Sequence, residues 1–257
     1  GYAMIFCEKP VCVSLDQVAE LEAIATPTAV FHDYRMMWGP QTLKEMLRNG
    51  DLGDLVCIEG RYWQASAAAR AISPPTAAKT KGWKGDAKLA GEFDVFLDLG
   101  THWADLAAFL YGTPPTSVSA WRSFANSEFP NLDTHVQLML DFPRGGRGFA
   151  SISKIMHGAT NGLELHLVGT KKTATWGFLN PDEITVGVGR DRSVLVRKSA
   201  DFGAKLPPFH GAGWLEGYIE IIRQGLRETA LKAPAHYPRL KENLPLLRSM
   251  LGVRWTN

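Results

Sequence analysis

The amino-acid sequence predicts an α+β protein, with a large, mainly antiparallel open sheet covered by helices and preceded by the tail of a doubly wound parallel sheet. Two observations carry this prediction. Strand-like and helix-like segments alternate through the first 50 residues, which is typical of parallel α/β sheets. Between residues 136 and 196, short alternating strands are joined by tight turns, which is typical of an antiparallel meander. The chain is 45% hydrophobic and 21% charged, so it can bury a sizeable core.

The alternating part begins in an apolar strand and has no initiating Met at position 1, so we expect it to be the later part of a longer protein. Ser14 followed by Gln17 is a capping-box pattern and predicts the start of a helix. Pro40 and Gly50 are typical of the first and last positions of another helix. The predicted strands are 1–7 and 29–31, and the predicted helices are 15–25 and 40–50.

After residue 50 the alternation of strands and helices gives way to a different pattern. A strand is predicted over 55–64, an irregular region over 65–92 and a helix over 98–111. The meander strands are predicted at 136–142, 149–155, 163–167, 174–178, 184–188 and 194–196, and the closing helices at 214–228 and 240–253. In the first closing helix, Trp214, Tyr218 and Ile222 recur at helical spacing and are predicted to face the core.

The segment from Asp98 to Asp105 offers the best candidate chemistry. On a helix, Asp98, His102 and Asp105 fall on neighbouring turns of one face, and a carboxylate beside an imidazole can form a proton-transfer pair. The alternatives are that Asp98 only caps the helix and that Asp105 forms a structural salt bridge. The spacing also resembles a metal site, but no HxH, HExxH or cysteine cluster completes it, so we expect no metal.

Charge and cysteine content narrow the class of protein. The net charge of +2 gives no indication of nucleic-acid or membrane binding, and no apolar run reaches the length of a membrane span. Three cysteines without CxxC spacing suit a reducing compartment, so we expect a cytoplasmic protein.

Three short motifs occur in order: Glu8-Lys9-Pro10, Asp33-Tyr34-Arg35, and the Asp-Leu-Gly-Thr-His segment 98–102. Together they resemble the glucose–fructose oxidoreductase and inositol dehydrogenase family (Gfo/Idh/MocA). The resemblance implies a remnant of an N-terminal Rossmann domain over 1–35 and a C-terminal substrate-binding α/β domain over 36–257, whose closing helix could pack back on the first domain. It also implies a homo-oligomer, dimer or tetramer, formed through the open sheet.

The resemblance implies an NAD- or NADP-dependent dehydrogenase for a secondary alcohol of a sugar, polyol or cyclic alcohol. Lys9, Asp98 and His102 are the implied catalytic residues, with His102 as the general base and Lys9 stabilising the developing alkoxide. Glu8, Lys9 and Pro10 are the implied cofactor contacts. The candidate substrate contacts are Arg35, Gln64, Trp83, Lys84, Asp86 and His157, with an ion pair as the equal alternative for Arg35.

One family feature is absent from the sequence. No G-x-G-x-x-G motif follows a first strand, and Gly145 and Gly146 lie in a predicted hairpin turn. We therefore expect this chain to bind NAD(P) weakly or not at all, most of the dinucleotide domain being missing. The alternative hypothesis is a non-catalytic ligand-binding or assembly protein of the same fold.

Overall fold

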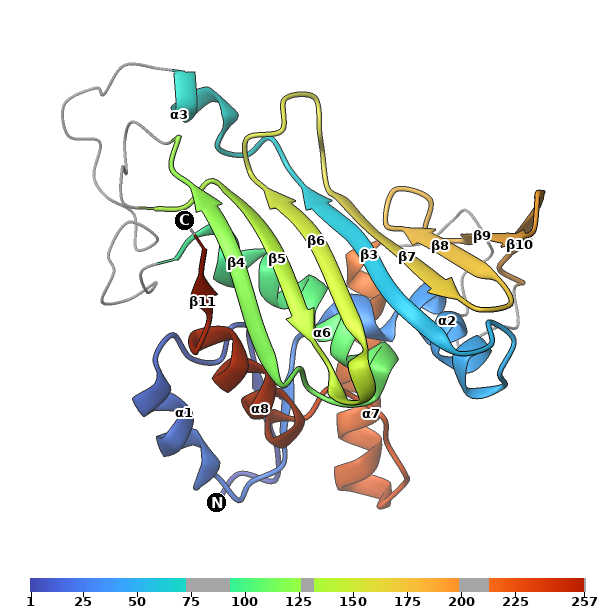
Figure 1. Ribbon diagram of the computed structural model, residues 1–257. Coiled ribbons are helices and arrows are strands. Elements are labelled where there is room, and N and C mark those ends of the chain that lie inside the picture. Colours follow the sequence, from blue (N-terminus) through green and yellow to red (C-terminus); the bar gives the residue numbers. More distant parts are fainter. Residues whose placement is uncertain (73–92, 126–131, 199–212, 257) are drawn as a thin grey trace.

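The computed structural model describes residues 1–72, 93–125, 132–198 and 213–256. Two sheets and several helices make up this part of the chain (Figure 1). The elements in chain order are β1 (Ile5–Cys7), α1 (Leu15–Glu22), β2 (Thr28–Val30), the 3₁₀ helix η1 (Asp33–Met36), α2 (Trp38–Arg48), β3 (Leu55–Trp63), α3 (Ala68–Ile72), α5 (Val95–Asp98), α6 (Gly100–Tyr111), β4 (Ser117–Ser123), β5 (His135–Asp141), the 3₁₀ helix η3 (Pro143–Gly145), β6 (Arg147–Ser153), β7 (Gly162–Gly169), β8 (Thr173–Gly177), β9 (Glu183–Val188), β10 (Asp191–Val196), α7 (Trp214–Leu231), α8 (Leu240–Leu251) and β11 (Arg254–Trp255).

The large sheet confirms the predicted fold class. Its strand order is β10-β9-β8-β7-β3-β6-β5-β4-β11, and its neighbours are antiparallel except for the pairs β3–β6 and β4–β11. The short strands β1 and β2 pair in parallel in a sheet of their own, as the alternating pattern predicts. Their carboxyl ends therefore lie at one edge of that small sheet.

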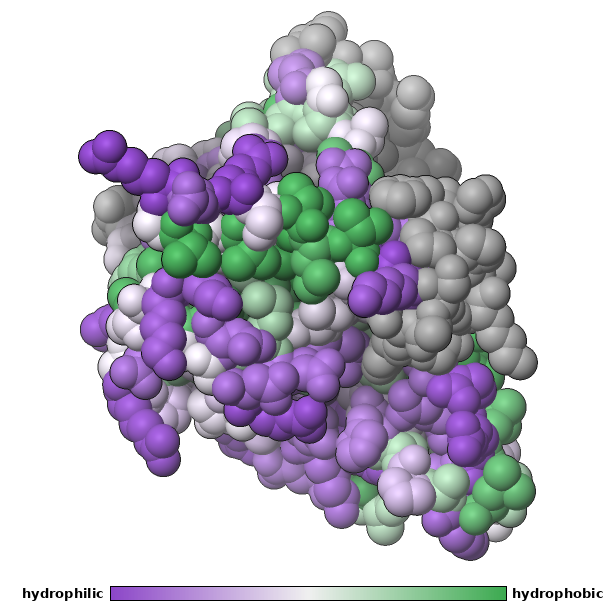
Figure 2. Space-filling view, turned by 90° about the vertical axis from the view of Figure 1, so that its right-hand side faces the viewer, coloured by the Kyte–Doolittle hydropathy of each residue, from purple (hydrophilic) through white to green (hydrophobic). Residues whose placement is uncertain are grey.

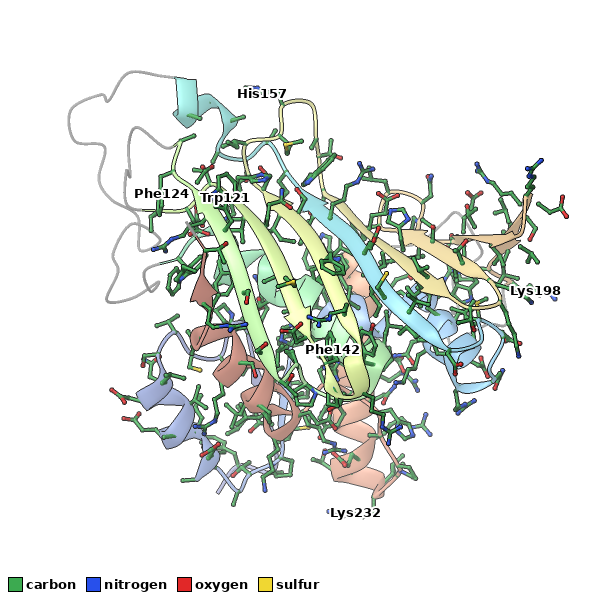
Figure 3. The ribbon with its side chains drawn as sticks, viewed as in Figure 1. Trp121, Phe124, Phe142, His157, Lys198 and Lys232 are labelled. Atoms are coloured by element: carbon green, nitrogen blue, oxygen red, sulfur yellow. The ribbon has the colours of Figure 1, made fainter. Side chains whose placement is uncertain are left out.

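One face of the large sheet carries the core. The side chains of Trp103 and Leu106 on α6 are fully buried in a cluster that includes Ile58 and Leu165 from the sheet. Gly60 permits this contact, because a Cβ there would lie 2.6 Å from Nε1 of Trp103 and 2.1 Å from the carbonyl oxygen of Glu164. The opposite face is open in Figure 3, and the exposed side chain of Trp121 lies on its strand β4.

Local sequence signals placed most elements correctly. Ser14 accepts a hydrogen bond from the backbone N–H of Gln17 at 3.3 Å, so the predicted helix cap is confirmed. The predicted helix 98–111 is divided, because α5 ends at Asp98 and α6 begins at Gly100. Strand β4 was not predicted, since its serines obscure the alternation of apolar residues.

The predicted core-facing stripe of Trp214, Tyr218 and Ile222 is wrong for Trp214 and Ile222, whereas Tyr218 is half-buried and stacks on Phe31. Trp214 is 48% exposed and Ile222 is 39% exposed. The buried positions of α7 include two glycines, and a Cβ on Gly217 would lie 2.1 Å from the carbonyl oxygen of Asp33. Close backbone approach, rather than an apolar stripe, therefore seats α7 against η1.

The closing helix α8 packs back on the segment around β1 and β2. Leu240, Leu244 and Leu247 form a buried cluster with Val18 of α1 and Val30 of β2. The same helix contributes Met250 to the core of the large sheet. Helix α8 thus joins the two sheets and fixes the edge at which the candidate site lies. Of the helices in the described part of the chain, none has the length and apolar character needed to cross a membrane.

Candidate active site

Two predicted catalytic residues meet across the two sheets. Lys9 follows β1, and its ammonium group donates to the Asp98 carboxylate at 2.7 Å and to the Asp98 carbonyl oxygen at 2.6 Å. Asp98 lies at the end of α5, where the helix gives way to α6. The break at this point leaves the carbonyl of Asp98 available to Lys9. The fold therefore brings together two residues that are 89 positions apart.

A second lysine, absent from the predicted set, also reaches Asp98. Nζ of Lys154 lies 2.8 Å from Oδ2 of Asp98 and also contacts the carboxylate of Asp94. Burial alone would raise the pKa of Asp98, but Lys9 and Lys154 outweigh this effect and hold that pKa well below its usual value. Asp98 is therefore ionised at neutral pH. Lys154 falls inside the predicted strand 149–155, so no separate sequence signal pointed to it.

His102 lies in the first turn of α6 and is buried. Its Nδ1 has no hydrogen-bond partner among the described residues and lies 3.8 Å from Oδ1 of Asp33. The rings of Tyr34 and His32 pack edge-on against it, with centroids at 5.0 and 5.9 Å. Burial, followed by the positive charge of Lys9, lowers the pKa of His102 well below 6.5. The imidazole is therefore neutral at pH 7 and able to accept a proton.

Asp33 and His32 also have altered proton affinities. Burial raises the pKa of Asp33 to about 7, although backbone hydrogen bonds and Lys9 oppose the effect. Burial lowers the pKa of His32 to about 4, with Asp105 opposing it. Nε2 of His32 lies 2.8 Å from the side-chain amide of Asn243 on α8. The site therefore contains titratable groups that change charge at neutral pH and below it.

An aromatic and amide network adjoins His102. The hydroxyls of Tyr34 and Tyr62 are 2.8 Å apart, and Tyr62 donates to the side-chain oxygen of Asn161 at 2.8 Å. Gln64, a predicted substrate contact, donates to the same Asn161 oxygen at 2.8 Å. Asn161 in turn donates to Tyr34 at 2.9 Å. The network links the end of β3 to η1 and to the loop before β7, and its sequence signal was only a cluster of polar residues after a strand.

Arg35 is held by carboxylates of the chain itself. Its guanidinium forms a two-pronged contact with Asp105, with Nε 3.0 Å from Oδ2, and also lies 3.2 Å from Glu242. This geometry is the ion-pair alternative that the sequence left open, and it does not favour Arg35 as a substrate contact. Asp105 pairs with Arg35, which is the structural salt bridge given as the alternative for Asp105.

The structure does not bring all of the remaining predicted residues to the Lys9–Asp98–His102 cluster. Glu8 accepts a hydrogen bond from the Tyr218 hydroxyl at 2.7 Å, so α7 holds the Glu-Lys-Pro motif. His157 is exposed beyond β6, and the structure shows no contact between it and the catalytic candidates. Trp83, Lys84 and Asp86 lie outside the described residues. Within the described ranges, no group of three or more His, Cys, Asp or Glu side chains is placed to hold a metal ion.

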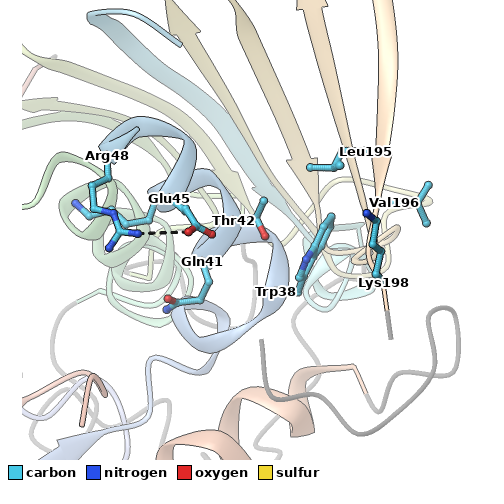
Figure 4. Close-up of a pocket in the computed structure, with 9 residues that line it drawn as sticks. Trp38, Gln41, Thr42, Glu45, Arg48, Leu195, Val196 and Lys198 are labelled. Carbon is cyan, nitrogen blue, oxygen red and sulfur yellow. Dashed lines mark hydrogen bonds and ion pairs between the residues drawn. The ribbon is translucent and has the colours of Figure 1, made fainter. Parts of the chain in front are cut away.

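A separate groove of about 520 Å³ lies between α2 and β10 (Figure 4). It is lined by Trp38, Gln41, Arg48, Leu195 and Lys198, among others, and by none of the catalytic candidates. Figure 2 views this edge of the molecule and shows apolar side chains gathered on it, and the residues of β10 are all exposed. The groove therefore belongs to the sheet edge and is distinct from the Lys9–Asp98–His102 cluster.

Comparison with known proteins identifies the fold and the family. The chain is 25% identical over 235 residues to the uncharacterized oxidoreductase YfiI of Bacillus subtilis (strain 168), covering 84% of this chain and 58% of that protein. It is 25% identical over 188 residues to the glucose-6-phosphate 3-dehydrogenase of the same organism, covering 69% of this chain and 51% of that protein. The chain thus spans just over half the length of these curated relatives.

Among solved structures, levoglucosan dehydrogenase in complex with NADH and levoglucosan has a similar fold. Its TM-score is 0.80 at 22% identity, covering 97% of this chain and 71% of that chain. The model of the GFO/IDH/MocA C-terminal domain matches residues 41–175, which is more than half of the sequence. The chain is therefore a member of the Gfo/Idh/MocA family of oxidoreductases.

Proposed function

We propose that this chain carries the proton-transfer and substrate-facing part of an NAD- or NADP-dependent dehydrogenase that acts on a secondary alcohol of a sugar, polyol or cyclic alcohol. The observation that carries the proposal is the convergence of Lys9, Asp98 and His102 at the carboxyl edge of β1 and β2. The names of similar proteins support the substrate class, since one is a glucose-6-phosphate 3-dehydrogenase and another is a levoglucosan dehydrogenase in complex with NADH and levoglucosan.

The residues at this edge fit the reacting end of a nicotinamide cofactor. In open α/β sheets, ligands bind beyond the carboxyl ends of parallel strands, which is where β1 and β2 place Glu8, Lys9 and Pro10. The 257-residue sequence contains no G-x-G-x-x-G to seat a pyrophosphate, so the proposal includes weak NAD(P) binding by this chain on its own. When bound, nicotinamide accepts or supplies the hydride.

His102 is the proposed general base. The imidazole is neutral at pH 7, so it can take the hydroxyl proton of the alcohol as the carbonyl forms. Asp33 lies near Nδ1 and would favour the tautomer that carries its proton there, which leaves Nε2 to accept the substrate proton. In the reverse direction, the resulting imidazolium returns the proton to the ketone oxygen.

Lys9 is the proposed stabiliser of the developing alkoxide. An ammonium group has three donors, and Lys9 directs two of them at Asp98. The third donor has no acceptor among the described residues and is available to the substrate oxygen. Because Asp98 anchors the other two, Lys9 is oriented before the substrate arrives, and such preorganised donors contribute most to stabilising developing charge.

Gln64 is the proposed hydroxyl-recognition residue among the described candidates, since its amide lies in the Tyr34–Tyr62–Asn161 network beside His102. Trp83, Lys84, Asp86 and His157 remain proposed substrate contacts on the family resemblance alone. The proposed cytoplasmic location accords with the three free cysteines.

We further propose that two or four copies assemble through the open sheet face. Trp121 and Phe149 are 42% and 40% exposed on neighbouring parts of this face, and exposed aromatic side chains are typical of interface anchors. Light scattering coupled to gel filtration should give a dimer or tetramer, and the Trp121→Glu, Phe149→Glu variant should be monomeric. A monomeric wild-type chain would contradict this proposal.

The dehydrogenase proposal is tested with this chain and with a version extended by any upstream coding sequence. Calorimetric titration with NAD⁺ and NADP⁺ measures cofactor binding, and absorbance at 340 nm measures turnover on inositols, glucose and glucose 6-phosphate. Turnover that disappears in Lys9→Met supports the proposal. Sugar binding without cofactor binding or turnover in either version would instead support the non-catalytic alternative, which the absent glycine motif favours.

A further inference from the structure

Lys154 is the one described lysine besides Lys9 that contacts Asp98. It comes directly after β6, and only 6% of it is exposed. Its ammonium group bridges the carboxylates of Asp94 and Asp98, which stand at the two ends of α5. The mechanism outlined above does not use this residue, although burying an ammonium group is costly unless charged partners compensate it.

The two lysines contact different oxygens of the Asp98 carboxylate. Lys9 contacts Oδ1 of Asp98 and Lys154 contacts Oδ2, so the two oxygens face cations on opposite sides. Lys9 comes from the small parallel sheet, whereas Lys154 comes from the large sheet. The carboxylate of Asp98 is therefore fixed in rotation by two separate parts of the fold.

Asp94 and Asp133 hold Lys154 and the start of α5 in place. The carboxylate of Asp133 is fully buried and accepts the backbone N–H groups of Asp94 at 2.6 Å and Phe96 at 2.8 Å, which anchors the start of α5. Asp94 supplies Lys154 with its second negative partner. The chain Lys9–Asp98–Lys154–Asp94 thus contains two positive and two negative charges, and it has no net charge.

We propose that Lys154 is a positioning residue that holds the Asp98 carboxylate ionised and oriented, so that Lys9 keeps one donor for the substrate. Without Lys154, the carboxylates of Asp94 and Asp98 would repel each other. Lys9 would then be the one cation among the described residues in contact with the Asp98 carboxylate, and it would be drawn closer to that carboxylate and away from the substrate oxygen. This role deepens the proposed function and rests on it, because it acts through Lys9.

The test compares Lys154→Met with two matched variants. Lys154→Arg keeps the charge, and Asp94→Asn removes the other partner of Lys154 while leaving its contact with Asp98. Among the described residues, the titrating and charged groups near Asp98 include Lys9, Lys154, Asp94, Tyr62 and His102. The first readout is the titration of the Asp98 side-chain carboxyl, followed by ¹³C NMR in this chain without cofactor.

In Lys154→Met the Asp98 midpoint should rise by at least about one pH unit, because a charged partner has been removed. Asp94→Asn should leave the midpoint in place or lower it, and Lys154→Arg should resemble the wild type. An unchanged midpoint in Lys154→Met overturns the proposal. Should that variant fail to fold, Lys154→Gln gives the same comparison, with thermal unfolding as the check.

The second readout is turnover in the version that shows dehydrogenase activity. Lys154→Met should lower kcat by about tenfold with little change in KM, and it should move the acid limb of the kcat profile to higher pH. A normal kcat with a raised Asp98 midpoint would overturn the positioning role. Absence of turnover in the wild type would instead count against the proposed function, and the carboxyl titration would still report on the Lys154–Asp98 contact.

Discussion

The two sides of the candidate site treat a buried acid in opposite ways. Asp98 lies between Lys9 and Lys154, and its pKa is held well below the usual range. Asp33 lies beside the neutral imidazole of His102, and burial raises its pKa to about 7. The difference shows that burial alone does not set the charge of a side chain here. The partner that the fold places beside the carboxylate decides whether it is ionised.

The largest expected effect is the loss of turnover when His102 is replaced. In the active protein, His102→Asn should reduce kcat by roughly 10²–10⁴-fold, because it removes the general base while keeping a polar side chain. The measurement is steady-state turnover at pH 7. His236→Asn, in an exposed loop, is the control and should retain wild-type kcat. A His102→Asn enzyme with near-normal kcat would remove His102 from the mechanism.

A third buried aspartate, Asp105, extends the comparison to a carboxylate that is paired with a buried arginine, Arg35. Asp105→Asn should lower the free energy of unfolding by roughly 3–5 kcal/mol, because it leaves the buried guanidinium of Arg35 with only the partly exposed Glu242. Urea denaturation measures the change. Glu45→Gln, which breaks the exposed pair with Arg48, is the control and should change stability by less than about 0.5 kcal/mol. Equal effects of the two variants would contradict the comparison.

Removing the unpaired acid should stabilise the fold. Since one pKa unit corresponds to about 1.4 kcal/mol, ionising Asp33 in the folded state costs roughly 4 kcal/mol above pH 7. The folded state holds the Asp33 proton more tightly than the unfolded state, so this cost develops as pH rises from about 4 to 7. Asp33→Asn should therefore raise the unfolding free energy more at pH 8 than at pH 5. Destabilisation at both pH values would show that Asp33 is paired in solution.

Lowering the pH should change the free energy of unfolding through His32 before it does so through Asp98, and this effect is smaller than those above. The pKa of His32 is lowered to about 4, so the unfolded state binds its proton first as pH falls below about 6.5. Stability should fall between pH 6.5 and 4 by up to roughly 3 kcal/mol for this residue. Asp98 contributes no change until pH falls below about 4, the unfolded value for Asp. Thermal unfolding of wild type and His32→Gln across this range isolates the His32 contribution from that of Asp33, and an identical pH dependence in the two proteins would contradict it.

Local sequence patterns predicted most of the elements, but not their packing. The strand alternation from 136 onwards and the cap at Ser14 depend on neighbouring residues, so they could be predicted. The apolar stripe of α7 misled for a physical reason. Its helix approaches η1 through Gly217 and the side chains of Met4 and Phe6 through Gly225, and glycine carries no hydrophobic signal in a periodicity argument.

The site was predicted in part. Lys9, Asp98 and His102 were predicted through the order of three motifs. Lys9 and Asp98 are in contact and their charges act on His102, while their catalytic roles stay a prediction. Lys154, Asn161 and Tyr62 were missed, because a lysine or a tyrosine on a strand is usually a surface or packing residue. Their roles arise from contacts between strands and loops that lie far apart in the sequence.

The sequence by itself determined the order of strands and helices, the change from alternating to meandering topology, and the motifs that contain the candidate proton-transfer residues. These features depend on side-chain periodicity and on local backbone preference. The tertiary structure alone decided which acid is ionised, because charge depends on partners in space. Lys9, which follows β1, and Lys154, which follows β6, both contact the Asp98 carboxylate. The Asp33 carboxylate instead lies 3.8 Å from the neutral imidazole of His102, and Arg35 is paired with Asp105 and Glu242.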